Sequence, residues 1–128
     1  MTIRFGTEGW RAVMAEEFTV ENVCRVTQGI AEHFLQGSGG RSPRLAVGYD
    51  LRFLSEEFAK AVCEVLAANG VAAILSDGPV PTCAVSRYVV DHRAAGGIVV
   101  TASHNPATYN GIKVKEGFGG SATTETVA

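Results

Sequence analysis

The sequence has little cysteine, and the placement of its three cysteines argues against a disulfide-stabilised fold. Cys24, Cys63 and Cys83 are odd in number, lie far apart and stand in apolar surroundings. Small secreted domains carry paired cysteines, and structural metal sites carry closely spaced ones. We therefore expect buried free thiols in the reducing environment of the cytoplasm.

Long apolar runs are also missing. The candidate runs, residues 71–75 and 98–100, have the length of core strands, whereas a membrane-spanning helix needs about 20 apolar residues. The opening stretch, MTIRFGTEGWR, has no apolar segment after its charged residue and does not resemble a secretory signal. The expected location is the cytoplasm, without a membrane partner.

Neither sign of charge dominates. The 11 lysines and arginines are nearly balanced by 13 acidic residues, for a net charge of −2. The basic residues form no dense stripe, so we predict no nucleic-acid partner. At 128 residues and 46% hydrophobic content, the chain can bury the core of one domain without disulfides or metals.

Helical and strand patterns alternate along the chain. Thr19 is a predicted N-cap of the first helix, with Phe18 and Val23 as a hydrophobic staple. Ser55 is the predicted cap of the second helix, which stops at Asn69. The remaining predicted elements are strands at 44–50, 71–75, 97–101 and 111–115, a helix at 82–90, loops at 36–43 and 117–120, and a last helix starting at Thr123 or Thr124.

This order predicts an α/β domain with three α/β/α layers. Its mixed sheet of about four strands should be mostly parallel, and the last strand antiparallel because its connection is too short for a crossover. In such folds, ligands bind outside the carboxyl ends of the parallel strands. Asp50, Asp77 and Ser103 stand at or just beyond such ends, which makes that edge the candidate site.

The stretch TASHNP, residues 101–106, delivers polar side chains directly after a buried strand. Asn105 and Pro106 resemble a helix N-cap followed by a first-turn proline, and free amides at a helix start favour phosphate. Ser103 would then carry or receive a phosphoryl group. His104 could donate to its oxygens, while Lys113 could neutralise charge or move a proton.

Other interpretations of the same residues stay open. The stretch could be only a capped turn, and Lys113 a solvated lysine on an edge strand. A serine hydrolase could pair Ser103 with His33, His92 or His104, although no Gly-x-Ser-x-Gly elbow is present.

Several motifs together are similar to those of the α-D-phosphohexomutases, the bacterial-type phosphoglucomutases and phosphomannomutases. The similarity covers nearly the whole chain, and its motifs occur in family order. They are FGTEGWR at 5–11, GYDLR at 48–52, TASHNP at 101–106 with YNGIKV at 109–114, and GGSAT at 119–123.

The resemblance implies a role for each matching residue. Ser103 would be a phosphoserine that exchanges its phosphoryl group with a hexose phosphate, through a hexose 1,6-bisphosphate. It would also be one ligand of Mg²⁺, through a phosphoryl oxygen. His104, Lys113 and Arg11 would surround the transferring group, with Lys113 as general acid or base. An ion pair of Asp50 with Arg52 would support the loop.

The resemblance also implies that residues 1–128 are domain I of a four-domain enzyme, truncated near its C-terminal helix. The metal-binding Asp-Gly-Asp-x-Asp-Arg segment of domain II does not occur in the sequence. Hexose phosphates and the missing domains II–IV would be the partners, and this chain alone would be inactive. The alternatives are a phosphoglucosamine mutase domain, against which Trp10 argues weakly, and a non-catalytic phosphosugar-binding module.

Overall fold

The computed structural model describes residues 3, 9–39, 41–103 and 105–120, and these form five strands and three helices. The elements in chain order are β1 (Trp10–Val13), α1 (Val20–Gln36), β2 (Arg44–Tyr49), α2 (Ser55–Ala68), β3 (Ala72–Leu75), α3 (Thr82–Asp91), β4 (Gly96–Val100) and β5 (Tyr109–Lys115).

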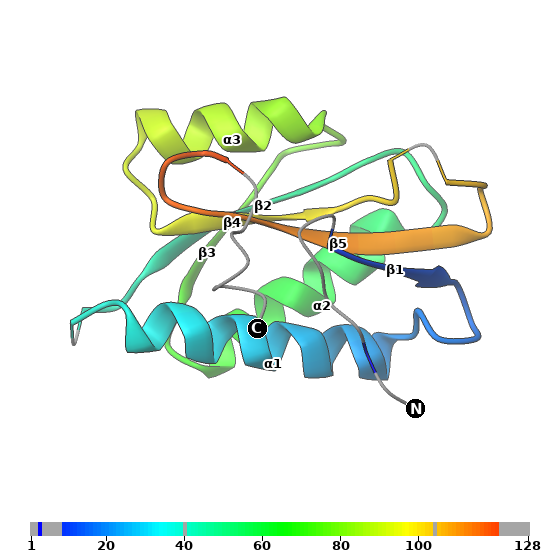
Figure 1. The fold of residues 1–128 in the computed structure, drawn as a ribbon, viewed down its shortest axis with the longest axis horizontal. Helices are drawn as coiled ribbons and strands as arrows, with labels where there is room; N and C mark the ends of the chain where they lie inside the picture. The colour runs from blue at the N-terminus through cyan, green and yellow to red at the C-terminus, as the bar shows by residue number, and fades with distance from the viewer. Residues whose placement is uncertain (1–2, 4–8, 40, 104, 121–128) are drawn as a thin grey trace.

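The strands form one mixed sheet in the order β1-β5-β4-β2-β3. β4, β2 and β3 run parallel, while β5 is antiparallel to β4 and to β1. α1 and α2 cover one face of the sheet and α3 covers the other, which gives three layers (Figure 1). The α/β class, the three layers and the antiparallel β5 were all predicted from the sequence.

The prediction of about four strands was one short, because it omitted β1. This strand has four residues, and it exists because β5 offers it a partner: Trp10 lies opposite Ile112 in the register. Trp10 is buried and stacks on Phe18, with ring centroids 4.7 Å apart. So short a strand is formed by tertiary pairing rather than by its own pattern.

The start of α1 agrees with the prediction. Thr19 is its N-cap, and its hydroxyl accepts a hydrogen bond from the backbone N–H of Asn22 at 3.2 Å. Phe18 and Val23 are both fully buried in the cluster beneath the sheet, as expected of a hydrophobic staple.

The predicted cap of α2 was wrong. Leu54 holds the capping position with φ +63° and makes no side-chain cap, and Ser55 is the first helical residue. The Ser55 hydroxyl instead donates to the Asp50 carboxylate at 2.7 Å. A serine that could have closed the helix is therefore used by the neighbouring polar site.

The cysteines are free, as predicted, but only two of them are shielded. Cys24 and Cys63 are half-buried, whereas Cys83 is exposed. Burial raises the pKa of the Cys63 thiol, and the nearby Glu64 carboxylate raises it further. None of the described helices is long and apolar enough to cross a membrane. The predicted helix starting at Thr123 or Thr124 lies outside the described residues.

α3 approaches the sheet closely because small residues lie beneath it. A Cβ on Gly97 would lie 2.8 Å from Cγ1 of Val85 and 3.1 Å from Cγ2 of Val89, both on α3. Gly48 on the neighbouring strand is equally crowded, with Val85 Cγ2 at 2.5 Å. The glycines thus set how near α3 packs to β2 and β4.

Substituting Gly97 tests this close packing. Gly97→Ala should destabilise the domain by about 1–3 kcal/mol, because the new methyl group overpacks a full interior. Gly29→Ala is the control: Gly29 is exposed on α1 with open space around it, so alanine should add about 0.5–1 kcal/mol of stability. Urea unfolding measures both. Equal effects of the two substitutions would contradict the packing argument.

Candidate functional site

Polar side chains gather where the parallel strands end, as predicted. Asp50 directly follows β2, and Ser103 comes three residues after the end of β4. The two are joined through Thr101, which bonds both of them. Asp77 lies beyond β3, on the far side of β2 from β4, so it belongs to the same edge but to another part of it.

Ser103 lies on an irregular loop, residues 101–108, which we call the serine loop. The residue is exposed and has φ +53°, a left-handed conformation that few residues other than glycine adopt. Such strained backbones are concentrated at functional sites. The side chain of a rigidly held, exposed serine is open to a reaction partner.

The helix start predicted at Asn105 and Pro106 was wrong. Residues 105–108 form turns, and β5 begins at Tyr109. The N–H of Asn105 donates to Ala102 O at 3.0 Å, and that of Tyr109 to Pro106 O at 2.9 Å. These local turns, and not a helix, shape the loop.

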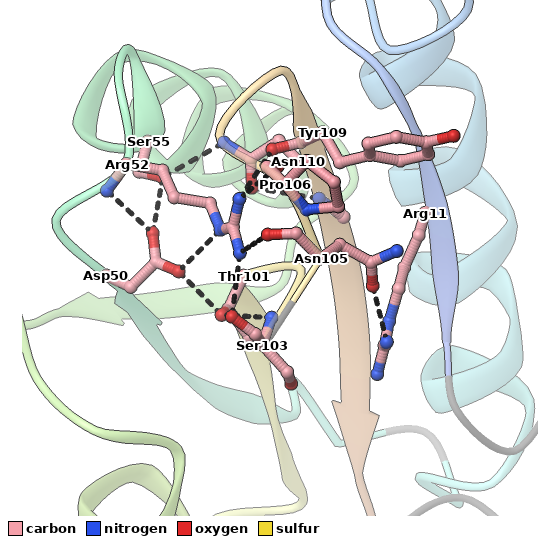
Figure 2. Close-up of polar contacts among 11 residues, drawn as sticks. Arg11, Asp50, Arg52, Ser55, Thr101, Ser103, Asn105, Pro106, Tyr109 and Asn110 are labelled. Atoms are coloured by element: carbon pink, nitrogen blue, oxygen red, sulfur yellow. Dashed lines mark hydrogen bonds and ion pairs between the residues drawn. The ribbon is translucent and has the colours of Figure 1, made fainter.

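Arg52 holds the serine loop by its backbone (Figure 2). Its Nη2 donates to the carbonyl oxygens of Ser103 at 2.7 Å and Asn105 at 2.6 Å. Its Nη1 donates to those of Pro106 at 2.7 Å and Tyr109 at 3.1 Å. One planar guanidinium therefore binds three carbonyl groups of a loop that has no ladder or helix to satisfy them, and a fourth on the first residue of β5.

Asp50 connects Arg52 to the start of α2 and to the segment after β4. One carboxylate oxygen accepts from Ser55 Oγ at 2.7 Å and from the Arg52 backbone N–H at 3.0 Å. The other accepts from Thr101 Oγ1 at 2.6 Å and lies 3.4 Å from Arg52 Nε. Asn110 Nδ2 extends the network by donating to Ser55 Oγ at 3.0 Å. The predicted ion pair of Asp50 with Arg52 is therefore present.

Arg11 and Lys113 come from the antiparallel half of the sheet. Arg11 lies opposite Gly111 on β5, and Lys113 lies opposite Val99 on β4, so both share the face on which α3 packs. Arg11 Nη1 donates to Asn105 Oδ1 at 2.7 Å, which joins β1 to the serine loop. Lys113 is half-buried on β5. The structure thus places Lys113 on the strand that follows the loop and Arg11 on the strand beside it.

A close backbone approach explains the glycine that precedes Trp10 and Arg11. Gly9 has φ +84°, and a Cβ there would collide with the backbone carbonyl of Ile112. A side chain at this position would push β1 away from β5, and Arg11 with it. Residues 5–8 of the motif FGTEGWR, and His104 of the serine loop, lie outside the described residues.

The structure separates two of the three histidines from Ser103. His33 lies near the end of α1, with Nε2 4.0 Å from the carboxylate of Glu116, which follows β5. His92 ends α3, and its carbonyl accepts from Arg44, the first residue of β2. Both histidines therefore lie at the edge opposite Ser103, and a hydrolase that uses either one is ruled out by the fold.

The described residues do not fit a Mg²⁺ site. Among them, no three carboxylate, histidine or cysteine side chains are grouped so that they could hold a metal. The Asp50 carboxylate, which Thr101 links to Ser103, already accepts hydrogen bonds on both oxygens. Hard cations such as Mg²⁺ need several free oxygen ligands.

The sequence did not reveal the role of Thr101, nor that Arg52 binds the backbone carbonyls around the serine loop. Arg52 has only 13% of its side chain exposed, whereas its apolar neighbours Leu51 and Phe53 are 87% and 73% exposed. Hydropathy predicts the opposite, an exposed arginine between two buried apolar residues, so it gave no sign that Arg52 is the least exposed of the three. The signal available was an acid at a strand end followed two residues later by an arginine.

Comparisons with known proteins find matches to both the sequence and the fold. The model of one family, described as phosphoglucomutase/phosphomannomutase, alpha/beta/alpha domain I, matches residues 2–128. A phosphoglucomutase of Staphylococcus saprophyticus is 36% identical over 126 residues, which covers 96% of this chain and 22% of that protein. A phosphoglucosamine/phosphogalactosamine mutase of Sulfurisphaera tokodaii is 38% identical over 110 residues, covering 86% of this chain and 23% of that protein.

A solved structure matches nearly all of the fold. The crystal structure of a candidate phosphomannomutase from Thermus thermophilus superimposes with a TM-score of 0.93 at 42% identity. The match covers 99% of this chain and 28% of that one. The chain thus spans between about a fifth and three tenths of the length of the relatives it matches.

Removing one acceptor oxygen from Asp50 tests the polar network. Asp50→Asn should lower the free energy of unfolding by about 1.5–3 kcal/mol, because an amide N–H₂ replaces an oxygen that accepts from Thr101 and Arg52. Asp77→Asn removes the same charge from an exposed residue at the same edge and should change stability by less than about 0.5 kcal/mol. Urea unfolding at neutral pH compares them, and equal losses would contradict the network's importance.

Proposed function

The chain belongs to the phosphoglucomutase/phosphomannomutase family, as its domain I, and we propose that it supplies the phosphoserine of a phosphohexomutase. Such an enzyme interconverts hexose 1-phosphates and hexose 6-phosphates, with glucose and mannose as the substrate sugars. The observation that carries the proposal is Ser103, exposed at the carboxyl edge of the sheet on a loop whose backbone Arg52 holds.

The proposed reaction has two phosphoryl transfers. First, a hydroxyl oxygen of the hexose monophosphate attacks the phosphorus on Ser103, the bond from phosphorus to Oγ breaks, and a hexose 1,6-bisphosphate forms. After this intermediate reverses its orientation in the site, Ser103 Oγ attacks its other phosphoryl group. That step releases the isomeric monophosphate and restores the phosphoserine. Positioning and charge neutralisation are the main contributions a protein makes to such transfers.

The two cations on the antiparallel strands have complementary roles in this proposal. Lys113 accepts the proton of the attacking sugar hydroxyl in one step and returns a proton in the other. Arg11 neutralises charge on the phosphoryl group, and its bond to Asn105 supports its place beside the loop. His104 donates to a phosphoryl oxygen, and this role rests on its sequence position alone.

We propose that the Mg²⁺ ligands and the sugar-binding groups of the site come from other domains. Mg²⁺ would need carboxylate ligands that the described residues do not supply, so we assign them to a further domain. Sugar recognition is assigned to further domains as well. On this proposal, the 128-residue chain by itself does not turn over hexose phosphates.

An amino-sugar substrate is the second candidate. The relative from Sulfurisphaera tokodaii is a phosphoglucosamine/phosphogalactosamine mutase and is 38% identical to this chain, slightly more than the phosphoglucomutase from Staphylococcus saprophyticus. Comparing turnover of glucose, mannose and glucosamine 1-phosphates by the full-length protein decides between the branches.

Phosphorylation of Ser103 is the direct test. The full-length protein that carries this chain, incubated with glucose 1,6-bisphosphate, should gain one phosphoryl group on the peptide containing Ser103, detected by mass spectrometry. Ser103→Ala should abolish both the modification and turnover, because it removes the hydroxyl that the loop presents. Ser76→Ala, which removes a serine hydroxyl beyond β3, should leave both intact. Binding of the bisphosphate without modification would favour the non-catalytic module.

Lys113 is tested through the rate of the chemical step. Lys113→Ala should lower kcat by about 10²–10⁴-fold, the usual contribution of a general acid or base. Lys60→Ala removes a lysine from the exposed surface of α2 and should leave kcat unchanged. If Lys113→Ala instead raises KM and leaves kcat unchanged, this lysine serves binding and not proton transfer.

A further inference from the structure

Both backbone polar groups of Ser103 are held by side chains. Its N–H donates to Thr101 Oγ1 at 3.0 Å, and its carbonyl accepts from Arg52 Nη2 at 2.7 Å. Figure 2 shows the two side chains meeting the serine from the strand end and from the segment after β2. The residue that carries the reactive hydroxyl is therefore fixed at its own peptide groups.

This double hold coincides with an unfavourable conformation. Ser103 has φ +53°, and a non-glycine residue stays in this region only where its surroundings over-determine it. Thr101 and Arg52 are such surroundings, because both are themselves anchored. Thr101 Oγ1 donates to Asp50 at 2.6 Å, and Arg52 Nε lies 3.4 Å from the same carboxylate.

Both terminal nitrogens of Arg52 are engaged by backbone carbonyls of the domain. A guanidinium has five N–H donors. The four on Nη1 and Nη2 that form hydrogen bonds donate to the carbonyls of Ser103, Asn105, Pro106 and Tyr109, while Nε lies 3.4 Å from the Asp50 carboxylate as an ion pair. A cation so close to a phosphoserine would ordinarily be assigned to phosphate binding, but the geometry here assigns it to the backbone.

We propose that Thr101 and Arg52 are positioning residues that hold Ser103 in its left-handed conformation and so aim its Oγ at the reaction partner, without touching substrate. The inference rests on the proposed phosphoryl transfer for its catalytic consequence, while its conformational part stands on the contacts alone. Because neither side chain binds substrate, loss of either one slows transfer and leaves substrate binding unchanged. Misplacement of a reacting group by about 1 Å can cost about 100-fold in rate.

The experiment compares isosteric and conservative substitutions in the full-length protein that carries this chain. Thr101→Val removes the hydroxyl at constant shape, and Thr101→Ser restores it. Arg52→Lys keeps the charge and loses the planar fork. Thr27→Val and Arg44→Lys are matched controls, since Thr27 donates to a carbonyl within α1 and Arg44 donates to carbonyls at the opposite edge of the sheet.

Two readouts separate conformation from catalysis. Amide hydrogen exchange at Ser103, followed by NMR, reports the backbone hold irrespective of any activity. It should be about 10-fold or more faster in Thr101→Val and near the parent value in Thr101→Ser and both controls. Steady-state kinetics should show kcat lower by about 100-fold in Thr101→Val and Arg52→Lys, with KM unchanged, and largely restored in Thr101→Ser.

Different failures have different meanings. Unchanged exchange at Ser103 in Thr101→Val, or a kcat of Thr101→Ser as low as that of Thr101→Val, overturns the positioning role. A raised KM at constant kcat in Arg52→Lys also overturns it, because Arg52 would then bind substrate phosphate. If the parent protein neither accepts a phosphoryl group nor turns over, the proposed function falls, and exchange at Ser103 alone decides the backbone hold.

Discussion

The guanidinium of Arg52 is the constraint on which the site depends. A loop that leaves a strand without entering a helix exposes carbonyl groups that need donors. Arg52 supplies donors to three of them and to the carbonyl of Tyr109 at the start of β5, and the planarity of the group fixes their mutual directions. The serine loop is irregular in backbone conformation, yet its carbonyls have a defined donor.

Asp50 extends this constraint to the rest of the domain. Its carboxylate accepts from the first residue of α2, from the strand end after β4 and from Arg52, so three segments meet on one group. The start of α2 is shaped by this use of Ser55: no side chain caps the helix, and Leu54 takes a left-handed conformation instead. The helix thus lacks a stabilising side-chain cap, and its serine belongs to the polar network instead. Proteins commonly break such local rules at functional sites.

Residues whose environment follows from local pattern were predictable. The start of α1 was predicted from Thr19, Phe18 and Val23. The apolar runs predicted the parallel strands, and with them the edge of the sheet where Ser103 lies. What failed depended on tertiary contacts, most of them with partners far away in the sequence. β1 exists only through β5, Ser55 serves Asp50, and Asn105 bonds Arg11 from a strand 94 positions away in the sequence. Arg52 was assigned its ion pair but not its four carbonyls, because no sequence pattern encodes contact with another loop's backbone.

The pairing of β1 with β5 has a consequence for the chain during its synthesis. About a hundred residues separate Trp10 from its strand partner Ile112, and β5 is the last strand of the described chain. At about 5–20 residues per second, Trp10 waits several seconds on the ribosome before its pairing strand has been made. Over that interval Arg11 has no partner strand, and the serine loop is itself made only just before β5. The cation and the serine therefore come together only once the sheet is complete, so an unfinished chain cannot bring its serine into the finished electrostatic setting.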